Sequence, residues 1–309
     1  MAGWLDKRAA KKRSRPKGVI AKGANAFLLA LTGKREHVPT GEEYPEQVVK
    51  RVSFEAGGGY GWKLSALWSP RETPAPWKIV VVTGAPSWAE YWAPVIAALP
   101  PDREMLVVDR PGFAHSEPFE CVPDLHTQAE ALLPALRSVP GQKVLLVGQS
   151  YGAAIATLMA HMRPKDIAGL VLLSGYFGHA GPTARFWVDM GKRVLGFIPR
   201  DLKNAVTEVA GQAGQLNRVF RLLTQHPLLV TFIHGDEDDF APIEVARRVA
   251  ELTMIPSRFI EVTGADHFFN DEDVGTILAC LEAAIDPRGQ LREVRAMAEA
   301  SSTPIALAV

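Results

Sequence analysis

Residues 143–162 read KVLLVGQSYGAAIATLMAHM. An apolar run of strand type ends at Ser150, and an alanine-rich run of helical type follows at once. Gly148 and Gly152 stand two residues before and after the serine. A serine on so sharp a turn, with glycines that avoid collisions with the strand and the helix, has the layout of a nucleophile elbow. The alternative is an ordinary strand-to-helix turn that contains a serine.

Strand-like and helical runs alternate from about residue 47 to residue 286. Strands are expected at 48–54, 62–68, 77–84, 104–109, 143–150, 169–177, 227–235 and 258–264, and helices at 87–100, 124–139, 153–162, 243–253 and 273–285. The first two strands flank GGGYG and read as a hairpin, and Asp124 is placed to cap a helix. The pattern predicts an α/β fold with a mostly parallel central sheet flanked by helices. Sites in such sheets lie at the carboxyl ends of the strands.

One interval, residues 178–227, contains no strand-like run. Helical stretches at 183–198 and 202–225 fill it, and the first is rich in large apolar side chains: Phe186, Trp187, Met190, Leu195 and Phe197. An insertion between two core strands would form a small helical cap over the carboxyl ends of the sheet. The alternative is a helix pair packed elsewhere on the surface. We therefore expect a core of residues 47–177 and 228–286, a cap of 178–227 and a C-terminal helix or tail of 287–309.

Composition bounds the kind of protein. The chain has 309 residues, of which 47% are hydrophobic, and one core of this size is compatible with a single catalytic domain. Cys121 and Cys280 lie far apart without metal-ligand spacing, and no Asn-x-Ser/Thr sequon is present, which favours a reducing, cytoplasmic location. The glycines at 57, 59 and 61 precede no helix and predict a turn, not a phosphate loop. No cofactor or metal is implied.

The formal net charge is zero, but the charge is unevenly placed. Eight lysines and arginines face only Asp6 within the first 22 residues, and the apolar stretch AFLLALTG follows at 26–33. This stretch is shorter than the roughly 20 residues that a transmembrane helix needs. For residues 1–46 we expect a basic arm with a short apolar helix. Peripheral membrane contact through residues 7–31 is the main alternative to a plain tail. A secretory signal and nucleic-acid binding are disfavoured, and the oligomeric state is left open.

A serine nucleophile needs a base and an acid that orients the base. His267 follows the strand 258–264 at the expected carboxyl edge, and the segment HGDEDDFAP (234–242) supplies several carboxylates after another strand. His234 is interpreted as a residue at the end of that strand. The remaining histidines lack a position suited to reach Ser150, and no catalytic role is expected for His37, His115, His126, His161, His179 or His226.

With these residues the chain resembles an α/β-hydrolase-fold serine hydrolase over about residues 47–286. The order of nucleophile, acid and histidine in that family matches Ser150, the acid cluster and His267. The family's acid loop has glycine, two residues, aspartate and then proline four places on, which implies Asp238 over Asp236 or Asp239. The segment DRPGFAHS (109–116) resembles a further family motif. TGAPSW (83–88) resembles the oxyanion loop, which implies backbone donors at Ala85 and Tyr151, although Thr83 replaces the usual histidine.

The resemblance implies cleavage of a carboxylic ester through an acyl-enzyme, with Ser150 as nucleophile, His267 as base and Asp238 as orienting acid. Hydrolysis of a carbon–carbon bond, an amide or a lactone, or cofactor-free perhydrolysis, would use the same residues. A ligand-binding protein without turnover is the alternative from another class. We expect a small, apolar ester as substrate, with Trp88, Trp187 and Met190 as candidate contacts.

Overall fold

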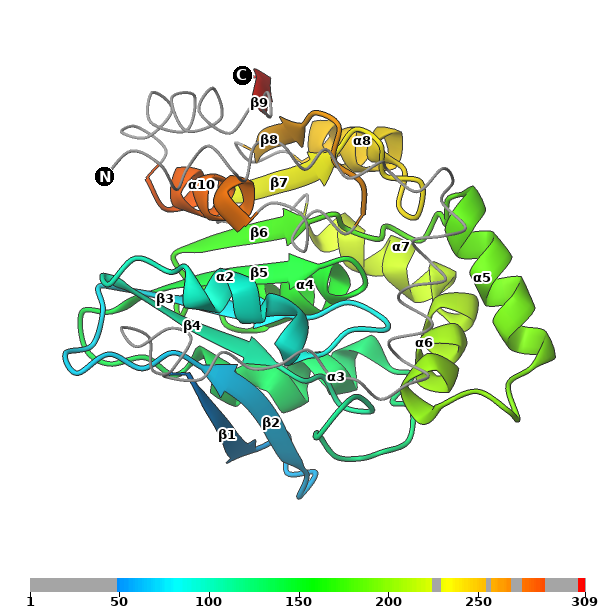
Figure 1. Ribbon diagram of the computed structural model, residues 1–309, viewed down its shortest axis with the longest axis horizontal. Helices are drawn as coiled ribbons and strands as arrows, with labels where there is room; N and C mark the ends of the chain where they lie inside the picture. The colour runs from blue at the N-terminus through cyan, green and yellow to red at the C-terminus, as the bar shows by residue number, and fades with distance from the viewer. Residues whose placement is uncertain (1–48, 224–228, 254–256, 268–273, 287–304, 309) are drawn as a thin grey trace, which may run out of the picture.

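Figure 1 shows the structure, a computed structural model that describes residues 49–223, 229–253, 257–267 and 274–286 and the backbone of 305–308. The basic arm expected at 1–46, including the membrane contact expected at 7–31, lies outside the described residues. None of the helices in the described part is long and apolar enough to cross a membrane.

One sheet holds all nine described strands. They are β1 (Lys50–Glu55), β2 (Lys63–Trp68), β3 (Trp77–Val82), β4 (Arg103–Val108), β5 (Lys143–Gln149), β6 (Gly169–Leu173), β7 (Val230–Gly235), β8 (Ser257–Val262) and β9 (Ile305–Ala308). Their order is β1-β2-β4-β3-β5-β6-β7-β8-β9. The pairs from β4 through β3 to β8 are parallel, whereas β1, β2 and β9 pair antiparallel with their neighbours. The mostly parallel sheet and the β1–β2 hairpin are confirmed.

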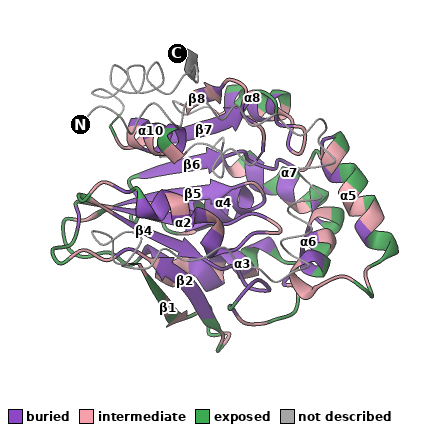
Figure 2. Cartoon of the chain, in the orientation of Figure 1, coloured by how far each residue is buried: buried purple, intermediate pink, exposed green. Residues whose placement is uncertain are grey.

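Helices cover both faces of the sheet. The 3-10 turn η1 (Ala89–Trp92), α2 (Ala93–Ala97) and α10 (Val274–Ile285) pack on one face, and α3 (Leu125–Leu132), α4 (Gly152–Met162) and α8 (Ile243–Leu252) pack on the other. Strand β3 shows why two cores form, because its alternate side chains point to opposite faces. Ile79 and Val81 join the core under α2 and α10, and Val80 and Val82 join the core under α4. Figure 2 shows the central strands β4 to β7 as largely buried.

Helix α3 is shorter than the helical run expected at 124–139. It begins as predicted, with the Asp124 carboxylate accepting a hydrogen bond of 2.7 Å from the Thr127 backbone N–H. After Leu132 the chain continues as the 3-10 turn η2 (Leu133–Leu136), which contains Pro134. Proline has no N–H to donate and its ring disfavours further α-helix. The helical run therefore ends early.

Three helices, rather than the expected pair of helical stretches, lie between β6 and β7: α5 (Pro182–Arg193), α6 (Arg200–Gly211) and α7 (Ala213–Leu222). Helix α5 ends at Arg193, so residues 194–198, which were expected to be helical, are not. The expected helix at 202–225 is divided at Gln212, whose side-chain amide bonds to the Pro123 carbonyl oxygen. Figure 1 shows α5, α6 and α7 beyond the carboxyl ends of β5 and β6.

The C-terminal segment contains a short strand that the sequence pattern does not predict. Residues 287–309 were expected to form a helix or tail, but the structure has strand β9 at 305–308. It pairs antiparallel with β8 over four positions, from Phe259 to Val262. The backbone N–H and C=O groups on the outer edge of β8, which would be unpaired in an edge strand, thereby gain hydrogen-bond partners. The rest of that interval lies outside the described residues.

Candidate active site

The elbow at Ser150 has the strained geometry that its sequence predicts. Ser150 has φ of +52°, a left-handed conformation that a residue with a side chain seldom adopts. A Cβ on Gly152 would lie 2.3 Å from the Val82 carbonyl oxygen, and one on Gly148 would lie 2.6 Å from the Ala153 Cα. Both contacts are with backbone atoms, so glycine is needed at both positions.

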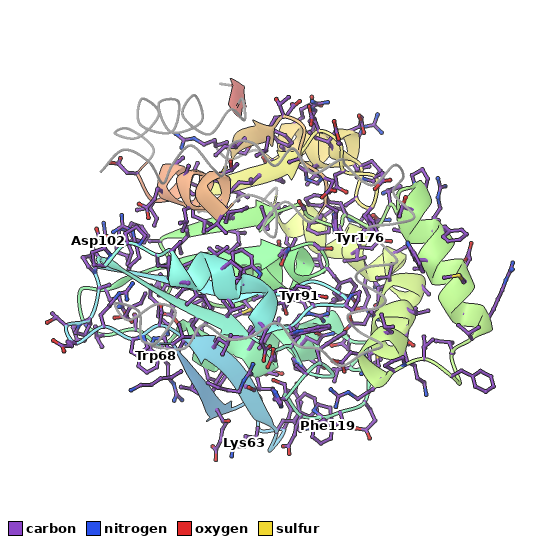
Figure 3. The ribbon with its side chains drawn as sticks, in the orientation of Figure 1. Lys63, Trp68, Tyr91, Asp102, Phe119 and Tyr176 are labelled. Carbon is purple, nitrogen blue, oxygen red and sulfur yellow. The ribbon has the colours of Figure 1, made fainter. Side chains whose placement is uncertain are left out.

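The backbone of Ser150 is held from two sides. Its N–H donates a 2.9 Å hydrogen bond to the Leu173 carbonyl at the end of β6, and its carbonyl accepts a 3.0 Å hydrogen bond from the Tyr176 N–H. Tyr176, labelled in Figure 3, lies just beyond the end of β6. On the other side of the elbow, the Trp92 indole N–H donates to the Gln149 side chain at 2.9 Å. The strained turn is therefore fixed by β6, its following loop and η1.

Ser150, His267 and Asp238 form one hydrogen-bonded chain. The His267 Nε2 lies 2.9 Å from the Ser150 Oγ, and the His267 Nδ1 lies 2.8 Å from the Asp238 Oδ2. Ser150 follows β5, Asp238 follows β7 and His267 follows β8. The carboxyl ends of these strands meet at one edge of the sheet. With Asp238 ionised, Nδ1 carries the imidazole proton and Nε2 is left to accept the serine proton. The Phe240 ring stacks on the imidazole with a centroid distance of 5.3 Å.

Asp238 is buried and accepts four hydrogen bonds. The backbone N–H groups of Phe240 and Ala241 donate to its Oδ1 at 3.0 and 2.8 Å. Its Oδ2 receives His267 and also lies 3.1 Å from the His234 Nε2. The same nitrogen of His234 lies 2.7 Å from the Ala241 carbonyl oxygen, so it carries a proton that both acceptors share.

These contacts shift the pKa values of the acid and the base in opposite directions. Burial opposes ionisation of Asp238, but the charge of His267 and the hydrogen bonds from both histidines hold its pKa well below its usual range. Burial also disfavours a charged His267, yet the Asp238 carboxylate outweighs it and raises the histidine pKa. Asp238 therefore stays an anion, placed to stabilise an imidazolium at His267.

His234 is the residue that sequence reasoning missed. It was expected only as a strand-end residue, and it does stand at the end of β7. Its side chain is buried, with 1% of its surface exposed, and it contacts the acid four residues later in the chain. The signal available in the sequence was a polar side chain at the end of an otherwise apolar strand, followed closely by the acid cluster.

The other carboxylates of the cluster have separate partners. The Asp236 side chain accepts a 2.6 Å hydrogen bond from the Gly264 backbone N–H, so it braces the loop that leads to His267. The Asp239 side chain accepts a 2.8 Å hydrogen bond from the Thr183 hydroxyl at the start of α5. Among these carboxylates, Asp238 is the one that contacts His267 through Nδ1.

The two expected backbone donors flank Ser150. Tyr151 is the residue that precedes helix α4, and Ala85 follows Gly84, whose added Cβ would lie 3.0 Å from the Ser150 Cβ. Within the described residues, neither the Ala85 N–H nor the Tyr151 N–H donates to another protein group. Thr83, which stands in place of the family's usual histidine, is buried and donates its hydroxyl to the Val108 carbonyl at 3.2 Å. The threonine therefore ties this loop to β4.

Of the expected substrate contacts, Trp88 directly precedes η1, and Trp187 and Met190 lie on α5. Trp88 has 6% of its surface exposed and packs on Tyr91, whose position Figure 3 labels. Trp187 and Met190 are half-buried on α5. The first turn of that helix reaches the acid loop through the Thr183 hydroxyl, and these two residues lie one and two turns further along. Two cavities, of about 280 and 800 Å³, are lined by other residues and do not include the three residues of the hydrogen-bonded chain.

The described residues contain no group of three or more His, Cys, Asp and Glu side chains placed to hold a metal. A family model described as alpha/beta hydrolase fold matches residues 78–229, which include the elbow and most of β3 to β6. The chain is an alpha/beta hydrolase fold protein. The match ends before the loops that carry Asp238 and His267, which follow β7 and β8 in the same sheet.

Two curated proteins that resemble this chain are named for hydrolytic reactions. A probable cadicidin biosynthesis thioesterase of Streptomyces griseus is 25% identical over 246 residues, which cover 72% of this chain and 67% of the thioesterase. A putative carbamate hydrolase RutD of Klebsiella pneumoniae is 30% identical over 117 residues, covering 36% of this chain and 44% of that protein. The chain thus matches less than half of this second relative's length.

The fold is shared with solved structures at low sequence identity. A thermophilic esterase from Thermogutta terrifontis superimposes with a TM-score of 0.56 and 19% identity, over 79% of this chain and 99% of the esterase. At this identity the likeness shows the fold alone.

Proposed function

We propose that the protein is a serine hydrolase that cleaves a carboxylic ester through an acyl-enzyme. The observation that carries the proposal is the hydrogen-bonded chain from Ser150 Oγ through His267 to Asp238, with lengths of 2.9 and 2.8 Å. Distances of this size are within reach for proton transfer between a nucleophile and its base.

In the first half of the reaction, the Ser150 Oγ attacks the ester carbonyl carbon and its proton passes to the His267 Nε2. The carbonyl oxygen becomes an oxyanion that accepts hydrogen bonds from the Ala85 and Tyr151 N–H groups. One such donor is worth about 3 kcal/mol of transition-state stabilisation. The bond to the alcohol oxygen then breaks, and His267 gives its proton to the departing alcohol.

In the second half, a water molecule gives a proton to His267 and attacks the acyl carbon. The new oxyanion collapses, the bond to Ser150 breaks, and the serine oxygen recovers its proton from His267. The products are one carboxylic acid and one alcohol. Asp238 stays ionised in both halves, because its role is to orient and stabilise the imidazolium.

The cap, residues 178–227, is the proposed binding surface for the apolar part of the ester. Helices α5 to α7 lie beyond the strand ends, and Trp187 and Met190 are its candidate contacts, with Trp88 from the core. The dependence of kcat and KM on acyl-chain length, measured with a series of esters, tests whether this surface binds the acyl group. The expected result is a preference among p-nitrophenyl esters that Trp187→Ala changes through KM more than through kcat.

A fluorophosphonate probe tests the chemistry, because it reacts with an activated serine. The wild-type protein should be labelled at Ser150, and Ser150→Ala should lose both the label and the turnover of p-nitrophenyl esters. A folded wild-type protein without label and without turnover would instead be a ligand-binding protein on this fold.

A thioester is the second candidate substrate. It is favoured by the name of the Streptomyces griseus relative, a thioesterase matched over 72% of this chain. The acyl-enzyme is the same, and only the leaving group differs. The test compares kcat/KM for an oxygen ester and for a thioester that carry the same acyl group. The substrate with the higher kcat/KM is the preferred class.

Membrane contact through residues 7–31 is a separate proposal, supported by their basic and apolar composition. Cosedimentation with anionic vesicles should require these residues. Equal sedimentation of the full chain and a form lacking residues 1–35 would contradict it.

A further inference from the structure

Arg110 is a fully buried arginine that the proposed reaction does not use. It follows strand β4, and its guanidinium has five hydrogen bonds. Nε and Nη2 donate to the Gly84 carbonyl oxygen at 3.2 and 2.8 Å. Nη1 and Nη2 donate to the two carboxylate oxygens of Glu208, both at 2.9 Å, and Nη1 also donates to Gln128 at 2.8 Å. The guanidinium lies over the rings of Phe113 and Tyr151, at 4.3 and 5.1 Å.

The Gly84 carbonyl belongs to the same peptide unit as the Ala85 N–H. In a planar trans peptide the two groups point in opposite directions, so fixing the carbonyl also fixes the direction of the N–H. The peptide lies beside the nucleophile, since an added Cβ on Gly84 would be 3.0 Å from the Ser150 Cβ. A cation on the carbonyl also polarises the amide and strengthens its N–H as a donor.

The charge partner of Arg110 comes from the cap. Glu208 lies on α6, and both side chains of this ion pair are fully buried, with no exposed surface. The Gln128 amide of α3 donates to the Glu208 Oε1 at 2.8 Å and to the Val122 carbonyl at 2.7 Å. A buried arginine without a counter-charge is costly, so Glu208 is what allows the guanidinium to remain in this position.

We propose that Arg110 is a positioning residue of the oxyanion hole and that the cap holds it through Glu208. The proposal rests on the proposed function, because it assigns the Ala85 N–H to the oxyanion. Its consequence is that the docking of α6 and the strength of the oxyanion hole are linked through one guanidinium.

The double variant Arg110→Met/Glu208→Leu tests this link. It removes both charges with side chains of similar volume, which a buried ion pair often tolerates, whereas either single change leaves one charge unpaired. We expect a folded protein whose kcat, per serine titrated with a fluorophosphonate, falls about 10- to 100-fold, with KM little changed. The rate of Ser150 phosphonylation should fall in parallel.

The matched control is Arg103→Met/Glu282→Leu. Arg103 and Glu282 are also joined by two hydrogen bonds, of 2.8 and 2.6 Å, but they link β4 to α10 away from Ser150. Its loss should change the melting temperature and leave kcat per titrated serine at the wild-type value. A purely structural role for Arg110 would make both double variants behave alike.

The outcomes separate the two proposals. A folded Arg110→Met/Glu208→Leu protein with wild-type kcat and phosphonylation rate would overturn the positioning role, and so would an equal loss in both double variants. Failure of the wild-type protein to label at Ser150 would instead overturn the proposed function. If the double variant does not fold, Arg110→Lys serves, because it keeps a cation for Glu208 but lacks the planar fork that donates to Glu208 and to the Gly84 carbonyl together. A severalfold slower phosphonylation supports the link, and an unchanged rate contradicts it.

Discussion

The His234 Nε2 lies 3.1 Å from the Asp238 Oδ2, the same carboxylate oxygen that receives the His267 Nδ1 at 2.8 Å. The acid is therefore held by two histidines and by two backbone N–H groups on its other oxygen. The direction of the Asp238 carboxylate sets the direction of the His267 ring. The contact with His234 therefore affects the orientation of His267, although His234 itself does not contact Ser150 in the described structure.

We predict that His234→Phe lowers kcat/KM by about 10-fold, because a hydrogen bond to a charged group is worth roughly 1.5–3 kcal/mol and three others still hold Asp238. The pKa of Asp238 should rise, since one group that stabilises its anion is lost. Steady-state kinetics with a p-nitrophenyl ester measures the rate, and thermal unfolding shows whether the fold persists. Wild-type kinetics in this variant would mean that His234 only fills space.

The three aspartates of the acid loop should respond differently to the same change. Asp238→Asn should reduce kcat by about 10⁴-fold, because an amide favours the wrong tautomer of the histidine. Asp236→Asn and Asp239→Asn keep an acceptor for Gly264 and Thr183 and should stay within about threefold of wild type. The comparison needs one substrate and one pH. A large loss at 236 with none at 238 would reverse the assignment.

The acidic limb of the pH–rate profile should lie above pH 6.5, the ordinary pKa of histidine. The base is active only when neutral, and the Asp238 carboxylate raises the pKa of His267, so kcat/KM falls as the pH drops through that raised value. Replacing Asp238 with asparagine removes the anion and should move the limb to lower pH. A profile of kcat/KM from pH 5 to 9 tests both statements. A limb at the same pH in the two proteins would show that another group controls it.

The elbow glycines should be sensitive to a single methyl group. Gly152→Ala places a Cβ 2.3 Å from the Val82 carbonyl oxygen and 2.6 Å from that of Thr83. We expect a loss of about 2–4 kcal/mol in the free energy of unfolding. The control Gly214→Ala lies on α7, where nothing stands within 4 Å of the added Cβ, and should be neutral or stabilise by up to about 1 kcal/mol. Urea unfolding measures both, and similar effects would contradict the clash.

Much of the core could be predicted because it is encoded locally. Each strand from β3 to β8 is a short apolar run, and the elbow, the acid loop and the loop before His267 each follow one of these runs. Parallel strands bring such loops to one edge, so the partners of Ser150 could be named without knowing any distance. The resemblance to a family then selected Asp238 among neighbouring carboxylates.

The contacts that escaped prediction depend on tertiary packing. Arg110 and Glu208 stand 98 positions apart in the chain, and neither carries a local signal of its partner. Gln212, where the helical run of the cap divides, likewise contacts the Pro123 carbonyl far away in the sequence, and β9 pairs with β8. His234 was missed because its ring turns toward the loop that follows, which the order of residues does not show.

The position of Glu208 restricts how the cap could be exchanged. Grafting a foreign insertion between β6 and β7 is an attractive way to alter substrate preference, since the Ser150 backbone bonds to Leu173 in β6 and to Tyr176 in the loop that follows. An incoming cap that brings no carboxylate to the guanidinium of Arg110 would leave a buried cation without its counter-ion. Successful chimaeras of this protein should therefore retain an acidic residue at this junction, whatever pocket the rest of the graft supplies.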